Sequence, residues 1–334
     1  MKVSGLLPPG GWFWAVLPLL VAGALGEGVS AQVVGGGEEG HALLQSCTLD
    51  DESRQAPCVA AIREARAIQA ALGILTLGGS PVPGSPGTVG RRLASSPRVS
   101  ISTRTQLLRV PLPTPETDVD GLQGDGSAFM LGGDATVAVG VFDGFFLAPT
   151  VGGILSVDAL AGAHFLGLPG GAGFSRWRMG YSAGARLGIV RESFTLPGLA
   201  ITARYAEVGP AVRGSLEGSE RERARVDLRA TSLRATVGKE LRALGFLAGA
   251  GWDRYRSDPV VGLPGDSGGG LTGQRDTRDR TVYFAGVSMT HLVLQLSGEV
   301  GWSPGREDGL PFPTTGFDPA RAGIFGSLGF RLTF

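Results

Sequence analysis

The residues of this chain that could carry acid–base or nucleophilic chemistry include only three histidines, His41, His164 and His291. Hydrolysis at a serine needs a histidine that contacts the nucleophile or is itself held by a carboxylate. Asp158 shares a face with His164, but six positions of extended chain separate them by about 20 Å. We therefore expect a protein that is not an enzyme. A hydrolase, as an alternative, requires a Ser–His or His–carboxylate contact at the rim of the fold.

The two cysteines, Cys47 and Cys58, lie close together in sequence. In an exported protein such a pair most simply forms one disulfide, and without nearby histidines it does not indicate a zinc site. The stretches GGSPVPGSPG and GDSGGG are rich in glycine, but neither lies between a strand and a helix of a parallel unit, as a phosphate-binding loop would. No metal site and no cofactor are predicted.

Composition favours β structure and says little about partners. The 30 basic and 30 acidic residues cancel, so no nucleic-acid partner is expected. Glycine is abundant at 56 residues, without the strict three-residue period of collagen. Glycine is unfavourable inside helices and tolerated where sheets bend, so many strands and turns are expected.

From Pro97 to the end of the chain, apolar and polar residues alternate, as in WRMGYSAGARLGI and LVLQLSGEVGW. Such alternation is typical of strands with one apolar and one polar face. A change of apolar register in the sixth strand, between Ala230 and Leu233, indicates a bulge near Thr231 or a miscounted register. About ten strands are expected, near 98–110, 127–142, 151–166, 174–191, 195–213, 224–239, 242–256, 279–290, 292–303 and 321–334.

The connections between these strands alternate in length. Those after the odd-numbered strands are about 16, 7, 10, 22 and 17 residues long, whereas most after the even-numbered strands are shorter. Outer-membrane barrels combine long extracellular loops with short periplasmic turns. A secreted β-sandwich also alternates, but its strands are usually shorter. We therefore predict an all-β, antiparallel transmembrane β-barrel of about 10–12 strands in the outer membrane of a Gram-negative-type bacterium. The start of the first strand and the end of the last strand are both expected on the periplasmic side.

Strand register predicts a set of charged residues inside the barrel. Charges enclosed there must pair or meet water, because an unpaired buried ion is costly. The set is interpreted as an ion-pair lattice that supports the wall, or alternatively as a pore lining with a mild anion preference. Its members are Arg104, Asp134, Asp158, Arg178, Arg186, Arg204, Arg225, Asp227, Arg229, Asp253, Glu299 and Arg331.

Two segments precede the barrel, which is assigned to residues 97–334. Residues 1–31 have one early lysine, an apolar run and a small-residue cleavage site, which is typical of a signal peptide. Residues 32–96 form a periplasmic or plug segment with an amphipathic helix over 59–75. Ala61, Ala65 and Ile68 begin its apolar face, and Arg63 and Arg66 lie opposite.

This order of helix, Gly/Pro-rich stretch and barrel ending in phenylalanine resembles the long-chain fatty-acid outer-membrane transporter family. The stretch that carries the resemblance is AALGILTLGGSPVPGSPGTVGRRL, residues 70–93. The resemblance implies a hatch inside the barrel and a passive route for small hydrophobic compounds through the wall. The family uses about fourteen strands, whereas the loop lengths here favour ten to twelve. A structural or surface-exposed barrel without transport is the main alternative.

The ending FGSLGFRLTF has apolar residues at even positions and Arg331 on the other face. In a closed barrel the last strand pairs with the first, so the chain can end within the sheet without leaving an edge. Phe334 is expected in an aromatic girdle and resembles the signal that the barrel assembly machinery recognises. Outer-membrane lipid, this machinery and a small hydrophobic ligand are the partners expected.

Overall fold

The computed structural model describes residues 52–84, 86–90, 97–117, 123–145, 154–170, 173–175, 177–193, 196–214, 223–262, 271–272, 275–305 and 322–334. The predicted signal peptide, His41 and Cys47 lie outside these ranges, so the signal peptide and the Cys47–Cys58 disulfide stay predictions. The elements in these ranges are α3 (Glu52–Leu77), β1 (Val99–Thr117), β2 (Gln123–Phe142), β3 (Ser156–Gly167), β4 (Trp177–Val190), β5 (Gly198–Arg213), β6 (Arg223–Leu241), β7 (Leu244–Ser257), β8 (Val260–Gly262), β9 (Leu271–Thr272), β10 (Asp276–His291), β11 (Leu294–Ser303) and β12 (Gly323–Thr333).

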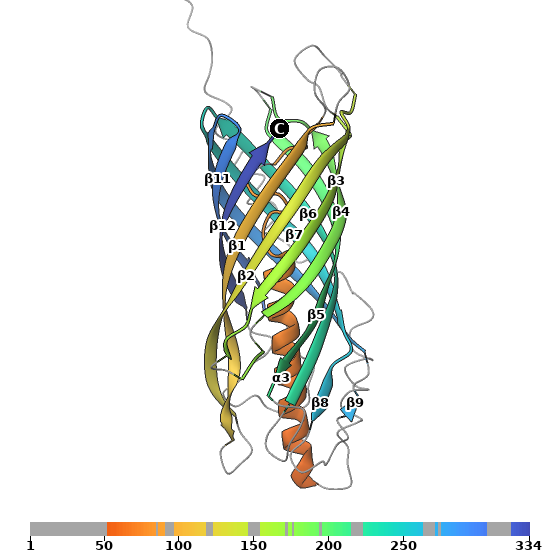
Figure 1. Cartoon of the computed structure of the whole chain (residues 1–334), viewed down its shortest axis with the longest axis vertical. Helices are drawn as coiled ribbons and strands as arrows, with labels where there is room; N and C mark the ends of the chain where they lie inside the picture. The colour runs from red at the N-terminus through yellow and green to blue at the C-terminus, as the bar shows by residue number, and fades with distance from the viewer. Residues whose placement is uncertain are drawn as a thin grey trace, which may run out of the picture. The chain divides into compact units, whose positions relative to one another are not determined.

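Ten of these strands form one closed antiparallel barrel (Figure 1). Going around it, β1 to β7 follow chain order, β10, β11 and β12 come next, and β12 pairs back onto β1. Two short strands stand outside this ring: β8 pairs with β6, and β9 pairs with β8. The predicted all-β antiparallel barrel is therefore confirmed, at the lower end of the expected strand number.

The last strand closes the barrel. Along β12, Thr333 pairs with Ser100 and Phe325 with Leu108 of β1. The Phe334 N–H donates to the Val99 carbonyl oxygen at 2.9 Å, so pairing reaches the final residue. Pairing of β12 with β1 therefore leaves no open edge between the first and last strands over Ser100–Leu108.

The outer face of the barrel is apolar. On β12, Ile324 and Leu328 are 70% and 72% exposed, while Arg331 lies on the inner face. Phe129, Met179 and similar large side chains are also exposed around the wall. A continuous apolar belt of this kind is unfavourable in water and suits the hydrocarbon of a bilayer. Within the described ranges, no helix is long and apolar enough to span a membrane.

Loop lengths follow the expected alternation only in part, because the connection after β2, residues 143–155, is longer than those after β3 and β5. The turns after β6 and β10 consist of residues 242–243 and 292–293, and they lie at the end of the barrel where β1 begins. The long connection expected after the first strand is wrong, because β1 and β2 continue as a paired ribbon to Thr117 and Gln123. The bulge expected near Thr231 is also wrong. β6 keeps its register, and the irregularity lies on β5, between Val208 and Ala211.

Helix α3 lies inside the barrel (Figure 1). It contacts β1, β2, β3, β5, β6 and β7, so strands surround it. Ile68, Leu72 and Leu75 are completely or almost completely buried, as the predicted apolar face requires. Arg66 is buried too, at 6% exposure, although it belongs to the face expected to be polar. Because the wall encloses the helix, that face meets strands rather than water.

Candidate functional site: the polar zone around the internal segment

The barrel interior has two zones that differ in chemistry. On β1 the inward residues run from Ser100 to Gln106 and then change to Leu108 and Val110. β6 changes in the same way, from Thr236, Arg234 and Ser232 to apolar residues. We call the part with inward polar side chains the polar zone. The apolar zone surrounds α3 and includes Leu108, Val110, Met130, Leu166, Val208, Val226, Leu228, Tyr255, Val282, Phe284 and Phe325.

Most of the charged residues predicted inside the barrel are placed there. We call the end of the barrel opposite the short turns after β6 and β10 the long-loop end. Arg178 lies there, where β4 begins, and its guanidinium donates to the Trp177 carbonyl oxygen at 2.9 Å. The others face the interior, namely Arg104, Asp134, Asp158, Arg186, Arg204, Asp253, Glu299 and Arg331.

The prediction is wrong for Arg225, Asp227 and Arg229, which point outward. Even-numbered residues of β6 face inward along its whole length, and Val226 and Leu228 pack in the apolar zone. The apolar side of this strand was expected to face lipid. In this part of the barrel the apolar residues contact α3, so charge lies outside.

The carboxyl end of α3 meets two arginines of the wall. The last carbonyl groups of a helix have no partner within the helix. Arg234 donates from Nη2 to the Leu77 carbonyl oxygen at 2.9 Å. The Gly78 carbonyl oxygen accepts from Arg104 Nη1 at 2.6 Å and from Gln106 Nε2 at 2.7 Å. Positive charge here also complements the negative end of the helix dipole.

The chain then turns at Gly79, which has a φ of +76°. A β-carbon at this residue would lie 2.7 Å from a carboxylate oxygen of Glu299, so glycine suits both the left-handed conformation and the space. Glu299 accepts from the Ser80 N–H at 2.9 Å, and Arg104 donates to the Ser80 carbonyl oxygen at 3.0 Å. The wall therefore holds the backbone of this turn on both sides.

Arg234 is itself anchored by a buried ion pair. Its two terminal nitrogens lie 2.6 and 2.8 Å from the carboxylate oxygens of Asp253, and both side chains are 0% exposed. The Tyr255 hydroxyl donates to the same carboxylate at 2.9 Å. Arg234 was not among the predicted interior residues, although Ser232, Arg234 and Thr236 form the polar side of an unbroken alternation.

Beyond this turn, the wall continues to contact the backbone of residues 81–90. Arg186 donates to the Gly87 carbonyl oxygen at 2.7 Å. Asp158 accepts from the N–H groups of Val89 and Gly90, at 2.8 and 3.4 Å. An extended chain cannot satisfy its own backbone groups, so buried side chains of the wall must do so. The Gly/Pro-rich composition of this stretch leaves its backbone accessible to them.

At the long-loop end, α3 has a second set of polar contacts. Glu64 pairs with Arg213 at 2.7 Å, and both side chains are nearly buried. Gln69 donates to the Ser257 hydroxyl at 2.8 Å and to the Asp276 carbonyl oxygen at 3.1 Å. These pairs were not predicted from the sequence, because the partners come from different segments and meet only when the barrel encloses the helix.

His164 contacts a serine, but inside the barrel rather than at the rim. His164 Nε2 and Ser182 Oγ are 2.9 Å apart, and Arg204 donates to the same hydroxyl at 3.0 Å. Among the described residues, His164 Nδ1 has no hydrogen-bond partner, so a carboxylate that would orient the ring is missing from this contact. His291, the last residue of β10, is exposed.

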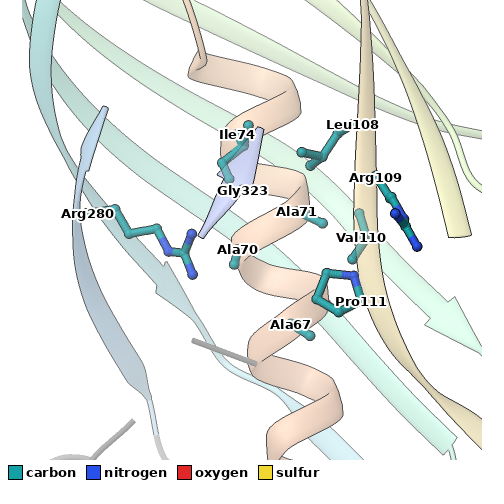
Figure 2. Close-up of a pocket in the computed structure, with 10 residues that line it drawn as sticks. All are labelled: Ala67, Ala70, Ala71, Ile74, Leu108, Arg109, Val110, Pro111, Arg280 and Gly323. Carbon is teal, nitrogen blue, oxygen red and sulfur yellow. The ribbon is translucent and has the colours of Figure 1, made fainter. Parts of the chain in front are cut away.

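A small gap lies between α3 and the wall. Figure 2 shows Ala67, Ala70, Ala71 and Ile74 on the helix side of this gap, with the Arg280 side chain extending toward the helix. The gap holds about 20 Å³, room for about one water molecule. Elsewhere in the described chain, no cluster of three or more His, Cys, Asp or Glu residues could hold a metal ion.

Closed strand order, an apolar outer face and a polar zone inside make this chain a bacterial outer-membrane type of β-barrel. No protein-family model and no curated relative matches it. The solved structures similar to it include the translocator domain of the autotransporter NalP from Neisseria meningitidis, at 15% identity over 73% of this chain and 90% of that one, with a TM-score of 0.41. Neisserial surface protein A is 10% identical over 71% and 97%, with a TM-score of 0.30. The outer membrane protease OmpT from Escherichia coli is 11% identical over 71% and 96%, with a TM-score of 0.34.

Proposed function

We propose that this protein is a closed, surface-exposed barrel of the outer membrane, whose own segment 61–90 blocks the lumen to solutes. The observation that carries the proposal is the contact between wall side chains and the backbone from Leu77 to Gly90. Arg234, Arg104, Glu299, Arg186 and Asp158 each bind a backbone group of this segment. Opening a pore would require breaking these buried contacts together.

The geometry also supports an orientation. If the short turns face the periplasm, as in other barrels, Val99 and Phe334 lie on the periplasmic side. α3 runs from the long-loop end, where Glu64 meets Arg213, to the polar zone at Leu77. In this proposed orientation the start of α3 at Glu52 lies nearer the extracellular side and its end at Leu77 nearer the periplasm.

Conductance of the purified full chain in planar bilayers tests the closed state. We expect no steady conductance from the wild type. The double variant Arg104→Ala with Arg234→Ala removes donors to Leu77, Gly78 and Ser80, and it should show intermittent openings. Arg109→Ala is the matched control, since Arg109 projects outward from β1 and contacts Ser127. Porin-like conductance by the wild type would overturn the proposal.

Passage of small hydrophobic compounds is a second candidate function, and the gap beside α3 supports it. Its helix side is lined by alanine and isoleucine, and its wall side includes Leu108 and Val110. The gap is far smaller than the roughly 300 Å³ of a small-molecule site, so a ligand would have to displace α3. Uptake of a radiolabelled apolar compound into liposomes containing the full chain tests this candidate. Uptake equal to that of protein-free liposomes would exclude it.

We propose further that the protein is not a hydrolase. The His164–Ser182 contact is buried on both sides, and Arg204 shares the serine hydroxyl. A serine-reactive fluorophosphonate probe should leave the folded full chain unlabelled. Labelling that disappears in Ser182→Ala would instead establish a nucleophile.

A further inference from the structure

The outer wall over β5, β6, β7 and β10 changes abruptly from apolar to charged. Leu233 and Trp252 are cross-strand partners on the outer face, and they form the last apolar row before the long-loop end. The next row pairs Thr231 with Arg254, and the row beyond it pairs Arg229 with Arg256. Charged side chains thus follow directly after this apolar row, and Arg254 is paired with Asp279 of β10 at 2.9 Å.

Arg229 and Arg256 lie directly opposite each other on adjacent strands, and both are exposed. Like charges in this arrangement destabilise a sheet. The nearest acid to Arg229 is Glu207, at 3.9 Å, and this carboxylate also accepts from the hydroxyls of Tyr181 and Tyr205. In the described part of the chain, Arg256 has no ion-pair partner. The next acids toward the long loops, Asp227 and Asp258, have other partners: Asp227 accepts from the Asp258 N–H at 2.8 Å, and Asp258 pairs with Arg275 at 3.4 Å.

Aromatic side chains near Arg229 and Arg256 indicate how deep this arginine pair lies in the membrane. Tyr181 and Tyr205 are 58% and 42% exposed and point outward beside Glu207. On β7, the guanidinium of Arg254 lies 4.9 Å from the centre of the Trp252 ring. Exposed tyrosine and tryptophan rings of a membrane barrel lie at the level of the lipid headgroups. Arg229 and Arg256 are therefore at headgroup level, above the acyl chains.

We propose that Arg229 and Arg256 together bind the phosphate of a lipid headgroup in the leaflet at the long-loop end. A guanidinium binds phosphate oxygens through two parallel hydrogen bonds, and a phosphate between two arginines removes their mutual repulsion. The acyl chains of the same lipid would lie along the apolar rows that begin at Leu233. A free anion could satisfy the arginines but would gain nothing from those rows.

Native mass spectrometry of the full chain in neutral detergent micelles tests the site. The probe is phosphatidic acid, compared with phosphatidylcholine of the same acyl chains. We expect the wild type to retain phosphatidic acid preferentially and Arg229→Gln with Arg256→Gln to retain it about tenfold less strongly. The control Arg109→Gln, an outward arginine on β1, should behave as the wild type. Equal retention by the double variant, or an equal loss in the control, would overturn the proposal.

Two further measurements separate the alternatives. Excess inorganic phosphate should displace little phosphatidic acid, and complete displacement would point to a free-anion site and overturn the lipid assignment. Thermal unfolding checks that the double variant folds. In neutral detergent its midpoint should equal or exceed that of the wild type, because a like-charge pair is gone. Phosphatidic acid should raise the midpoint of the wild type only. An equal rise in both proteins would contradict the site.

Discussion

The polar and apolar zones inside the barrel enclose the same internal segment, yet they hold it in different ways. In the apolar zone, Leu108, Met130 and Phe325 pack against the side chains of α3. In the polar zone, wall side chains bind backbone atoms of residues 77–90. A helix satisfies its own backbone hydrogen bonds, so the wall around it can be apolar. Once the helix ends, the wall must supply donors and acceptors. The change in wall chemistry thus follows the end of the helix.

The largest effect is expected when the Arg234–Asp253 ion pair, which lies where the apolar and polar zones meet, is removed. Arg234→Ala leaves Asp253 buried without its partner, and loss of one member of a buried pair costs about 3–5 kcal/mol of unfolding free energy. Chemical unfolding in detergent micelles, followed by tryptophan fluorescence, measures this loss. Arg234→Met combined with Asp253→Leu should recover much of it. If the double variant is no more stable than the single one, the charge argument fails.

A test in the apolar zone is expected to have a slightly smaller effect. Leu72→Ala deletes a fully buried side chain of α3 and should lower the unfolding free energy by about 2–5 kcal/mol, because a cavity remains. The matched control is Leu328→Ala on the lipid-facing side of β12. Acyl chains can refill that space, so the control should lose clearly less stability. Equal losses would mean that α3 packs loosely inside the barrel.

A close backbone approach in the polar zone allows a third test. A β-carbon at Gly140 would lie 1.8 Å from the Gly90 carbonyl oxygen, so Gly140→Ala must displace the internal segment. We expect a loss of about 1–3 kcal/mol in the same unfolding measurement. Gly326→Ala is the control, since no atom lies within 4 Å of its β-carbon position. An unchanged stability in Gly140→Ala would show that the segment is not held against β2.

The last test addresses the His164–Ser182 contact, with an effect expected to be no larger than that of Gly140→Ala. Ser182→Ala removes the hydroxyl that lies 2.9 Å from His164 Nε2 and accepts from Arg204 at 3.0 Å, and it should cost about 1–3 kcal/mol. The thermal midpoint in neutral detergent is the measurement, with Thr202→Ala as a control, since the Thr202 hydroxyl is buried without a hydrogen-bond partner in the described structure. A loss as large as that of Arg234→Ala would give the histidine a larger structural role than its contacts indicate.

The sequence by itself determined the class of fold. Three features can be read from the order of residues along the chain: the alternation with a period of two, the lengths of the connections and the ending FGSLGFRLTF. Together they predicted the closed barrel and the inward side of β12. Local order also identified α3, although its predicted range of 59–75 is shorter than the observed one.

Only the tertiary structure decided which face of β6 is inward and what holds the internal segment. An apolar face contacts either lipid or a buried helix, and alternation alone does not distinguish the two. Because Val226 and Leu228 were expected to face lipid, Arg225, Asp227 and Arg229 were wrongly predicted to lie inside the barrel. Arg234, which does lie inside, was not predicted. The contacts of Arg234 with Leu77 and of Asp158 with Val89 join segments far apart in the chain. Such pairs form only when the barrel closes around the helix, so no local pattern in the sequence could specify them.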